Sequence, residues 1–213
     1  MKIVVTAGPT IEPIDDVRCL TNFSSGKTGY GIAEAARERG HSVVLISGPV
    51  RMSPPAGVRV VNVRTAIEMQ QAIEAEFADS DALVMAAAVC DFRPAARHVG
   101  KLSRGSGALT LELVANPDII ASFGAKKGER VIMGFALESE NGVSSARAKC
   151  ERKNCDLVAL NSPSVLDSDS TVITLVFRTG EVRPLPELPK GDAACLLVKE
   201  VEKLHAQSGQ YGG

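Results

Sequence analysis

Short β-branched runs alternate with helical patterns along most of this chain. Six runs are typical of buried strands, and they cover residues 2–6, 42–46, 58–61, 82–86, 130–135 and 157–160. Helical patterns cover residues 26–39, 65–77 and 142–152. Strands that alternate with helices favour an α/β fold with a mostly parallel, doubly wound sheet. With 213 residues, the chain is long enough for one such domain.

Local signals mark several boundaries of these elements. Thr65-x-x-Glu68 fits a capping box at the start of the helix over 65–77. A strand is predicted over 109–114. Asn116-Pro117-Asp118 then predicts a helix start, with Asn116 as N-cap, proline at the first helical position and an acid at the second.

The C-terminal part has a different pattern. Residues 171–177 and 181–185, with a turn near Gly180, predict an antiparallel β-hairpin, and a last helix follows over 192–205. The expected architecture is therefore a Rossmann-like, mostly parallel sheet with a C-terminal hairpin appendage. Ligands of such sheets bind beyond the carboxyl ends of the strands, which points to the loops 7–25, 86–108, 135–141 and 161–170.

Composition excludes several classes of function. Lys and Arg number 24 and Asp and Glu 25, so the chain lacks the basic excess of a nucleic-acid-binding protein. Aromatic residues make up only 4%, too few for a base-stacking platform. The longest apolar run, residues 82–90, is far shorter than the roughly 20 residues that cross a bilayer, and no export signal is visible. We therefore expect a cytoplasmic protein that binds neither nucleic acid nor membrane.

The five cysteines (Cys19, Cys90, Cys150, Cys155 and Cys195) form no CxxC pair and have no nearby histidine partners. Zinc binding is therefore not predicted, and the thiols are interpreted as structural. The sequence shows no Ser–His–Asp or Cys–His order and no evident pair of catalytic carboxylates. If the protein is an enzyme, we expect it to work by positioning and charge neutralisation rather than through a protein nucleophile.

The glycine-rich segment 24–31, Ser-Ser-Gly-Lys-Thr-Gly-Tyr-Gly, opens the first helix. Small residues there would let backbone amides approach a phosphate, and the helix dipole favours an anion. The alternative is a serine N-cap with glycines that pack against the sheet. A Walker A loop is excluded, because the glycine required five residues before Gly26 is Thr21. NAD is not favoured, because the second strand ends at Ser47 without the acid that would bind its ribose.

Basic residues gather in two further places. The segment 92–111 contains Arg93, Arg97, Lys101 and Arg104 but no acid, which suits either a lid over a polyanion or a solvated loop. Lys149, Arg152 and Lys153 share a helix face, where their mutual repulsion would be relieved by an anionic ligand. Asp91, Asn22 and Asn161 lie in loops at strand ends, where each could bind a ligand or fix a turn.

Seven ordered blocks resemble the phosphopantothenoylcysteine synthetase (phosphopantothenate–cysteine ligase) family. They read Thr6-Ala7-Gly8-Pro9-Thr10-x-Glu12-Pro13-Ile14-Asp15-x-Val17-Arg18, Thr21-Asn22-Phe23-Ser24-Ser25-Gly26-Lys27, Ala86-Ala87-Ala88-Val89-Cys90-Asp91-Phe92-Arg93-Pro94, Lys101-Leu102-x-Arg104, Asn116-Pro117-Asp118-Ile119, Gly134-Phe135-Ala136-x-Glu138 and Lys149-x3-Lys153-Asn154-x-Asp156-Leu157-Val158-x-x-Asn161. The match covers about residues 1–205, and its order makes it far more specific than any one glycine motif.

The resemblance implies a two-step ligation in coenzyme A biosynthesis. CTP would activate the carboxylate of 4′-phosphopantothenate as an acyl-cytidylate and release pyrophosphate. The amine of cysteine would then displace CMP and form 4′-phosphopantothenoyl-cysteine. Mg²⁺ is implied as a cofactor. The family's decarboxylase half, which carries flavin, has no counterpart here, so no flavin is predicted. The chain is interpreted either as a stand-alone synthetase or as a domain of a bifunctional protein.

The resemblance also assigns roles to individual residues. The triphosphate would be held by Gly8, Ser24, Gly26 and Gly29. The rest of the nucleotide would be framed by Met85, Ala86, Ala87, Asp91, Pro117, Asp118, Ile119, Ile120, Phe135, Lys149, Lys153 and Asn161. Asn22 would contact the activated acyl group, and Ala87, Ala88 and Asp91 the pantothenate. Lys101, on a flap over about 92–108, would bind the nucleotide and neutralise charge in the second half-reaction.

The family's site lies at a homodimer interface, so Arg18 would reach the phosphopantothenate of the neighbouring subunit. The hairpin over about 171–185 is the expected dimerisation element. The flap departs from the usual Lys-x-Lys-Lys, because Ser103 and Arg104 follow Leu102. Thr28 replaces the usual Met, and Cys90 the usual Ala or Ser. Two other hypotheses are a nucleotide-binding module without catalysis and an NAD(P)-dependent reductase. The sequence has no Tyr-x3-Lys pair to support the reductase.

Overall fold

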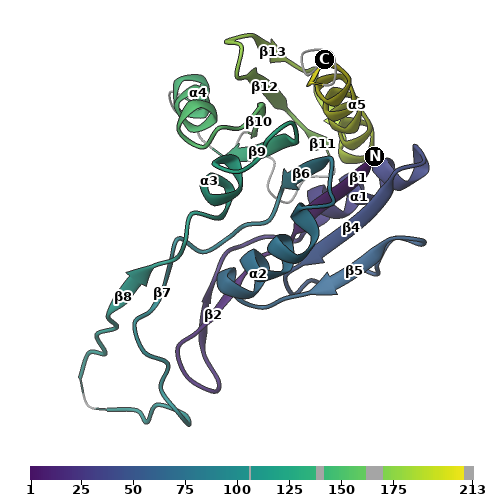
Figure 1. The fold of residues 1–213 in the computed structure, drawn as a ribbon. Coiled ribbons are helices and arrows are strands. Elements are labelled where there is room, and N and C mark those ends of the chain that lie inside the picture. Colours follow the sequence, from purple (N-terminus) through teal and green to yellow (C-terminus); the bar gives the residue numbers. More distant parts are fainter. Residues whose placement is uncertain (106, 138–141, 162–169, 209–213) are drawn as a thin grey trace.

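The computed structural model describes residues 1–105, 107–137, 142–161 and 170–208 (Figure 1). Its main element is an eight-stranded sheet with the order β13-β12-β10-β9-β6-β1-β4-β5. The strands are β1 (Lys2–Ala7), β4 (Ser42–Ser47), β5 (Arg59–Asn62), β6 (Ala82–Met85), β9 (Val131–Leu137), β10 (Leu157–Asn161), β12 (Ile173–Phe177) and β13 (Val182–Pro184). The first six in chain order are parallel, and β12 and β13 add to the β10 edge in antiparallel pairing. The predicted doubly wound sheet with a C-terminal hairpin is confirmed.

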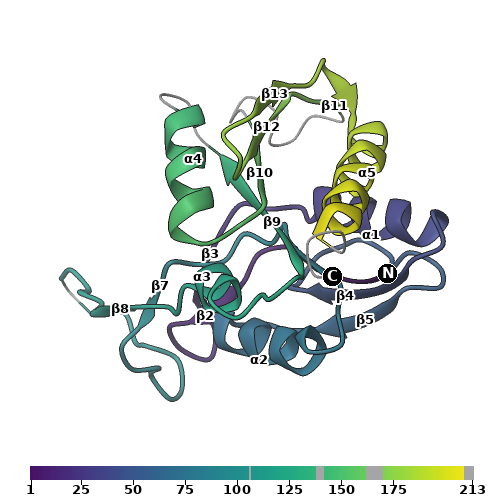
Figure 2. The ribbon, with the colours of Figure 1, turned by 45° about the horizontal axis from the view of Figure 1, so that its top comes forward.

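Helices cover both faces of this sheet (Figures 1 and 2). Helices α1 (Lys27–Glu38) and α5 (Lys190–Ser208) pack on one face, and α2 (Ala66–Phe77), α3 (Ile119–Gly124) and α4 (Gly142–Arg152) pack on the other. In β1, Ile3 and Val5 pack in the hydrophobic core between the sheet and helices α1 and α5, and Val4 packs in the core on the opposite face, under α2, α3 and α4. Burial on both faces explains why these strands are almost continuously apolar.

The starts of α2 and α3 show how local sequence sets the boundaries of helices. Thr65 caps α2 by accepting from the Glu68 amide at 3.1 Å, as the capping box predicts. The predicted N-cap of α3 is wrong by two residues, because Asp118 rather than Asn116 caps it, accepting from the Ala121 amide at 3.2 Å. Asn116 instead donates its side-chain amide to the Cys90 carbonyl at 2.8 Å.

Two small hairpins extend from one end of the sheet, toward the lower left of Figure 1. The first pairs β2 (Ile11–Pro13) with β3 (Cys19–Thr21), and the second pairs β7 (Phe92–Pro94) with β8 (Leu113–Ala115). We call residues 11–21, 92–105 and 107–115 the arm. The predicted loop over 7–25 is therefore wrong at these two short strands, Ile11–Pro13 and Cys19–Thr21. The strand predicted over 109–114 is wrong at its start, since pairing begins at Leu113.

The C-terminal strands are more divided than predicted. Residues 171–177 do not form one strand, because β11 (Ser170–Thr171) pairs with β14 (Leu188–Pro189) while β12 begins at Ile173. No helix within the described ranges is long and apolar enough to cross a membrane.

Candidate active site

The strand order places a crevice at the carboxyl ends of β1 and β6. From β1 the chain proceeds outward through β4 and β5 and then returns to continue through β6, β9 and β10. In doubly wound sheets, ligands bind where the winding reverses in this way. The loops that follow β1 and β6 carry Gly8, Ala87, Ala88 and Asp91, so these predicted residues lie at the reversal point.

The glycine loop is closely packed against the end of β1. Gly8 and Gly26 have φ of +72° and +80°, in the left-handed region that favours glycine. A Cβ on Gly29 would lie 2.5 Å from the Cβ of Ala7. Gly26 is the N-cap of α1, without a side-chain capping bond and with no acid in the first turn. The serine N-cap of the alternative interpretation is therefore wrong, although the Lys27 amide makes a long 3.5 Å contact with the Ser25 hydroxyl, whereas its close packing of glycine on the sheet is confirmed at Gly29. This helix start is electrostatically suited to an anion.

Asn22 connects the glycine loop to the segment that follows β6. Its side-chain amide donates to the Ala88 carbonyl at 3.0 Å. The Ala88 amide in turn donates to the Gly8 carbonyl at 2.9 Å. Three residues with predicted roles in phosphate, acyl and pantothenate binding are thus joined directly by hydrogen bonds.

Two buried threonines fix the same segment, and the sequence analysis missed both. The Thr6 hydroxyl accepts from the Ala87 amide at 3.1 Å, and the Thr10 hydroxyl accepts from the Cys90 amide at 2.9 Å. Both threonines are fully buried in or just after β1. For Thr6, a threonine in an otherwise apolar strand is the signal that could have identified it, because a buried hydroxyl needs a hydrogen-bond partner. Thr10 lies beyond the strand and gave no such signal.

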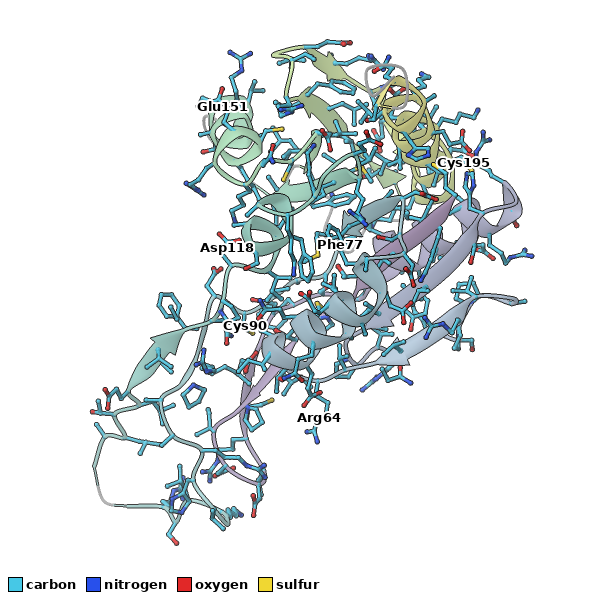
Figure 3. The ribbon with its side chains drawn as sticks, viewed as in Figure 1. Arg64, Phe77, Cys90, Asp118, Glu151 and Cys195 are labelled. Atoms are coloured by element: carbon cyan, nitrogen blue, oxygen red, sulfur yellow. The ribbon has the colours of Figure 1, made fainter. Side chains whose placement is uncertain are left out.

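A cavity of about 400 Å³ opens beside this segment. It is bounded by the end of β6, the start of α3, the middle of β9 and one face of α4. Its lining contains most of the predicted nucleotide residues, and it comprises Met85, Ala87, Val89, Cys90, Asp91, Phe92, Ala115, Asn116, Pro117, Asp118, Ile119, Ile120, Phe135, Lys149 and Lys153. Figure 3 shows Cys90 and Asp118 where the arm meets the sheet. Val89, Cys90, Phe92, Ala115 and Asn116 are lining residues that the sequence analysis did not assign.

Two lysine side chains in the cavity wall already have polar partners. The Lys149 ammonium donates to the Phe135 carbonyl, and the Lys153 ammonium lies 3.1 Å from the Asp118 carboxylate. The predicted repulsion among the α4 cations is therefore already reduced at Lys153. Because the Lys153 side chain is 16% exposed and Asp118 is 49% exposed, an entering phosphate or base could compete for either partner.

The cysteines fit a structural role. Burial raises the pKa of the Cys90 thiol, which donates to the Thr10 carbonyl at 3.6 Å. Burial also raises the pKa of Cys150 to about 11 and that of Cys155 to about 12. These thiols are protonated at neutral pH, so none of the three is an activated nucleophile.

Several predicted residues lie away from this cavity. Ala86 packs against the core on the α1 and α5 face, and Asn161 at the end of β10 accepts from the Thr171 hydroxyl at 3.4 Å. Arg18 and Lys101 belong to the arm and are not part of the cavity lining. Glu138 of the recognised motif lies outside the described residues.

The chain is similar to known proteins along almost its whole length. Residues 1–204 match the family described as the DNA/pantothenate metabolism flavoprotein C-terminal domain. The chain is 38% identical over 213 residues to the coenzyme A biosynthesis bifunctional protein CoaBC of Bacillus subtilis, covering 98% of this chain and 52% of that protein. It is 41% identical to the CoaBC protein of Vibrio vulnificus, covering 95% of this chain and 52% of that protein. The chain thus spans about half the length of these relatives.

A solved structure shows the same fold. The crystal structure of the C-terminal domain of a CoaBC protein superposes with a TM-score of 0.85 and 36% identity, covering 97% of this chain and 96% of that chain.

Proposed function

This chain belongs to the family of the DNA/pantothenate metabolism flavoprotein C-terminal domain, and on that basis we propose that it joins cysteine to 4′-phosphopantothenate with consumption of CTP. The Bacillus subtilis and Vibrio vulnificus relatives are named as coenzyme A biosynthesis proteins, which agrees with this reaction. We propose that residues 1–213 form a single synthetase domain with a flap over about residues 92–108. We also propose that the protein is located in the cytoplasm.

One observation carries the proposal. The hydrogen-bonded series from Asn22 through Ala88 to Gly8 places an amide side chain next to the glycine loop at the start of α1. The cavity is lined by residues on both sides of Ala88 along the same segment, among them Ala87 and Val89. A carboxylate held at Asn22 would therefore lie between the glycine loop and the cavity, where it can attack the α-phosphate of a bound nucleotide.

In the first half-reaction, a carboxylate oxygen of phosphopantothenate attacks the α-phosphorus of CTP. The bond between the α-phosphorus and the bridging oxygen breaks, and pyrophosphate leaves with its electrons. The protein's contribution is to hold the triphosphate against the helix start at Gly26, while Lys149 and Lys153 frame the rest of the nucleotide. Fixed positive charge of this kind stabilises charge that develops on the phosphate oxygens.

In the second half-reaction, the amine of cysteine attacks the acyl carbon. The carbon–oxygen bond to CMP breaks, CMP leaves and the amine loses a proton. Asn22 would orient the acyl group through its amide, and Lys101 of the flap would offset the negative charge that develops on CMP. This scheme requires no covalent bond to the protein, which is consistent with the buried, protonated thiols. Since no electrons are transferred, we expect no flavin requirement.

Mg²⁺ fits this site as a companion of the nucleotide. Within the part of the chain that the structure describes, no group of three or more His, Cys, Asp or Glu side chains could hold a metal. Nucleotide sites commonly hold Mg²⁺ through substrate phosphates and one or two carboxylates. Asp91, in the cavity lining, is the carboxylate best placed to contribute, and the ion would neutralise phosphate charge.

We further propose that two subunits share the site. Arg18, which would reach a neighbouring subunit, lies beside Val17, and the arm carries Val17, Phe92 and Val99 at 66%, 55% and 88% exposure. Large apolar side chains that are exposed on one element are typical of a subunit interface. The dimerisation element predicted from the resemblance is instead the hairpin over 171–185. Its outer strand, β13, carries Arg183 and Pro184, and such residues discourage pairing at the edge of a sheet.

The direct test of the function is pyrophosphate release by the purified protein with 4′-phosphopantothenate, Mg²⁺ and either CTP or ATP. We expect release with CTP in the absence of cysteine, and CMP with a thiol-bearing product when cysteine is added. If neither nucleotide gives pyrophosphate with folded dimeric protein, the binding module without catalysis becomes the better hypothesis. A thermal shift with NADPH, and none with CTP, would favour the reductase.

A further inference from the structure

A buried carboxylate in the arm accepts hydrogen bonds from two separate parts of the chain. The Asp15 side chain is 0% exposed, and it lies in the turn between β2 and β3. Its Oδ1 accepts from the Val17 and Arg18 amides at 2.7 and 2.6 Å, which shapes the turn itself. Its Oδ2 accepts from the Arg18 guanidinium at 2.9 Å and from the Leu102 amide, 87 residues away, at 3.0 Å. Asp15 therefore joins the turn to the flap.

The neighbouring residue makes the matching connection on the other side of Lys101. The Asp16 carboxylate accepts from the Gly100 amide at 2.9 Å and from the Arg97 guanidinium at 2.7 Å. The Asp16 amide donates to the Gly100 carbonyl at 3.3 Å. Gly100 has φ of +81°, a conformation that most other residues would adopt only with strain.

Arg18 completes the connection. Besides its ion pair with Asp15, its guanidinium donates to the Leu102 carbonyl at 3.2 Å. Leu102 is therefore held at both its amide and its carbonyl, and Gly100 is likewise held at both. Lys101 lies between two residues whose backbones are fixed to the turn, while its own side chain is exposed.

We propose that Asp15 is a positioning residue that holds Arg18 and Lys101 in one rigid charged unit, so that the flap lysine moves together with the turn. The inference rests on the proposed function, in which Arg18 meets phosphopantothenate and Lys101 serves the second half-reaction. Asp16 contributes less than Asp15, because its side chain is about half exposed. It fixes Gly100, the residue on the other side of Lys101.

The state of the carboxyl group agrees with this assignment. Burial works against the charged form of Asp15, but hydrogen bonds from the amides of Leu102, Val17 and Arg18 outweigh it and lower the pKa to about 2. The carboxylate therefore remains charged at every pH at which the enzyme would be assayed, and it accepts from several donors at once.

The first test measures the connection without reference to activity. Trypsin can cut after Lys101, inside the held segment, and after Arg104, outside it. In Asp15→Asn, an NH2 group in place of Oδ2 would face the Leu102 amide and the Arg18 guanidinium, which are themselves hydrogen-bond donors. Because these hydrogen bonds would be lost, we expect the ratio of cleavage at Lys101 to cleavage at Arg104 to rise about tenfold. Asp16→Asn, at a more exposed position, should give a smaller rise. Glu74→Gln, which affects an exposed pair with Lys126 outside the arm, is the matched control.

The second test measures the role in the reaction. In Asp15→Asn we expect the cysteine-dependent release of CMP to slow about tenfold, with the KM for CTP within about twofold of the wild-type value. A merely structural role would instead slow pyrophosphate release, measured at saturating phosphopantothenate, by the same factor as cysteine transfer. Asp16→Asn provides the same comparison if Asp15→Asn does not fold.

The two tests fail separately. An unchanged cleavage ratio in both variants would show that the connection does not hold Lys101, whatever the enzyme does. A raised ratio with an unchanged rate of cysteine transfer would overturn the positioning role. If the wild-type protein releases no pyrophosphate, the proposed function fails and the positioning role fails with it, while the cleavage ratio still decides whether Asp15 holds the flap.

Discussion

Gly29 and Gly31 lie two residues apart in α1, yet the structure predicts opposite effects for the same substitution. A Cβ on Gly29 would lie 2.5 Å from the Ala7 Cβ and 2.8 Å from the Thr6 carbonyl oxygen, so α1 would have to move away from β1. Overpacking of this kind costs about 1–3 kcal/mol. A Cβ on Gly31 would have the Ala194 Cβ as its nearest neighbour, at an ordinary 3.6 Å. Alanine there should stabilise the protein by about 0.5–1 kcal/mol through its helix propensity.

The assay is urea unfolding of both variants beside the wild type. For an m-value of about 2 kcal/mol per molar urea, Gly29→Ala should lower the midpoint by about 0.5–1.5 M, and Gly31→Ala should raise it by about 0.25–0.5 M. Because Gly29 lies in the first turn of the helix that we propose binds the phosphates, its variant should also bind CTP more weakly. Equal midpoints for the two variants, with equal affinity for CTP, would refute the claim that close packing on β1 sets the position of this helix start.

Three further substitutions or conditions test the site. Asn22→Asp would place a carboxylate oxygen against the Ala88 carbonyl and beside an anionic intermediate, and we expect acyl-cytidylate turnover to fall about 100-fold; wild-type turnover in a quenched-flow assay would contradict the role of Asn22. Lys101→Gln should slow cysteine transfer about tenfold without changing the CTP-induced thermal shift, and an unaffected rate would transfer the role to another flap cation. The third test is the pH dependence of Asp15, whose pKa is lowered from 3.8 to about 2, so the stability it contributes is present above pH 4 and is lost as the pH falls toward 2. Hydrogen exchange at the Leu102 amide should therefore show constant protection, after correction for intrinsic rates, from pH 7 to 5 and a loss toward pH 2; a loss already complete at pH 5 would contradict the assignment.

The parallel sheet could be predicted because each strand is defined by its own residues. Runs such as Lys2–Ala7 and Ala82–Met85 are buried on both faces, so their apolar character does not depend on knowing their neighbours. The lining of the cavity was largely assigned as well, but through the family resemblance. Apolar residues such as Met85 and Ile120 carry no chemical signal of a binding site.

The arm was missed because its order comes from contacts distant in the sequence. The β2–β3 hairpin is short, with three residues in each strand, and the proline- and aspartate-containing segment that forms it looks like a loop. Two buried acids give it structure: Glu12 accepts from the Ala66 amide at the start of α2, and Asp15 accepts from the Leu102 amide. Since each bond joins residues more than fifty positions apart, no local pattern could reveal it. The shift of the α3 cap has the same origin, because the Asn116 side chain is occupied by Cys90 and Arg93.

The residues with proposed roles lie on two separate parts of the structure. The glycine loop and the cavity are built on the sheet and on α1, α3 and α4, whereas Arg18 and Lys101 are built on the arm. Free-energy changes on these two separate parts should add, so the factors by which Gly29→Ala and Asp15→Asn lower the overall rate should multiply. Asn22 lies at the junction, since it follows β3 of the arm and donates to Ala88 of the sheet segment. Its substitution should therefore be coupled to both of the others, and it is the residue through which the position of the arm can influence the activated acyl group.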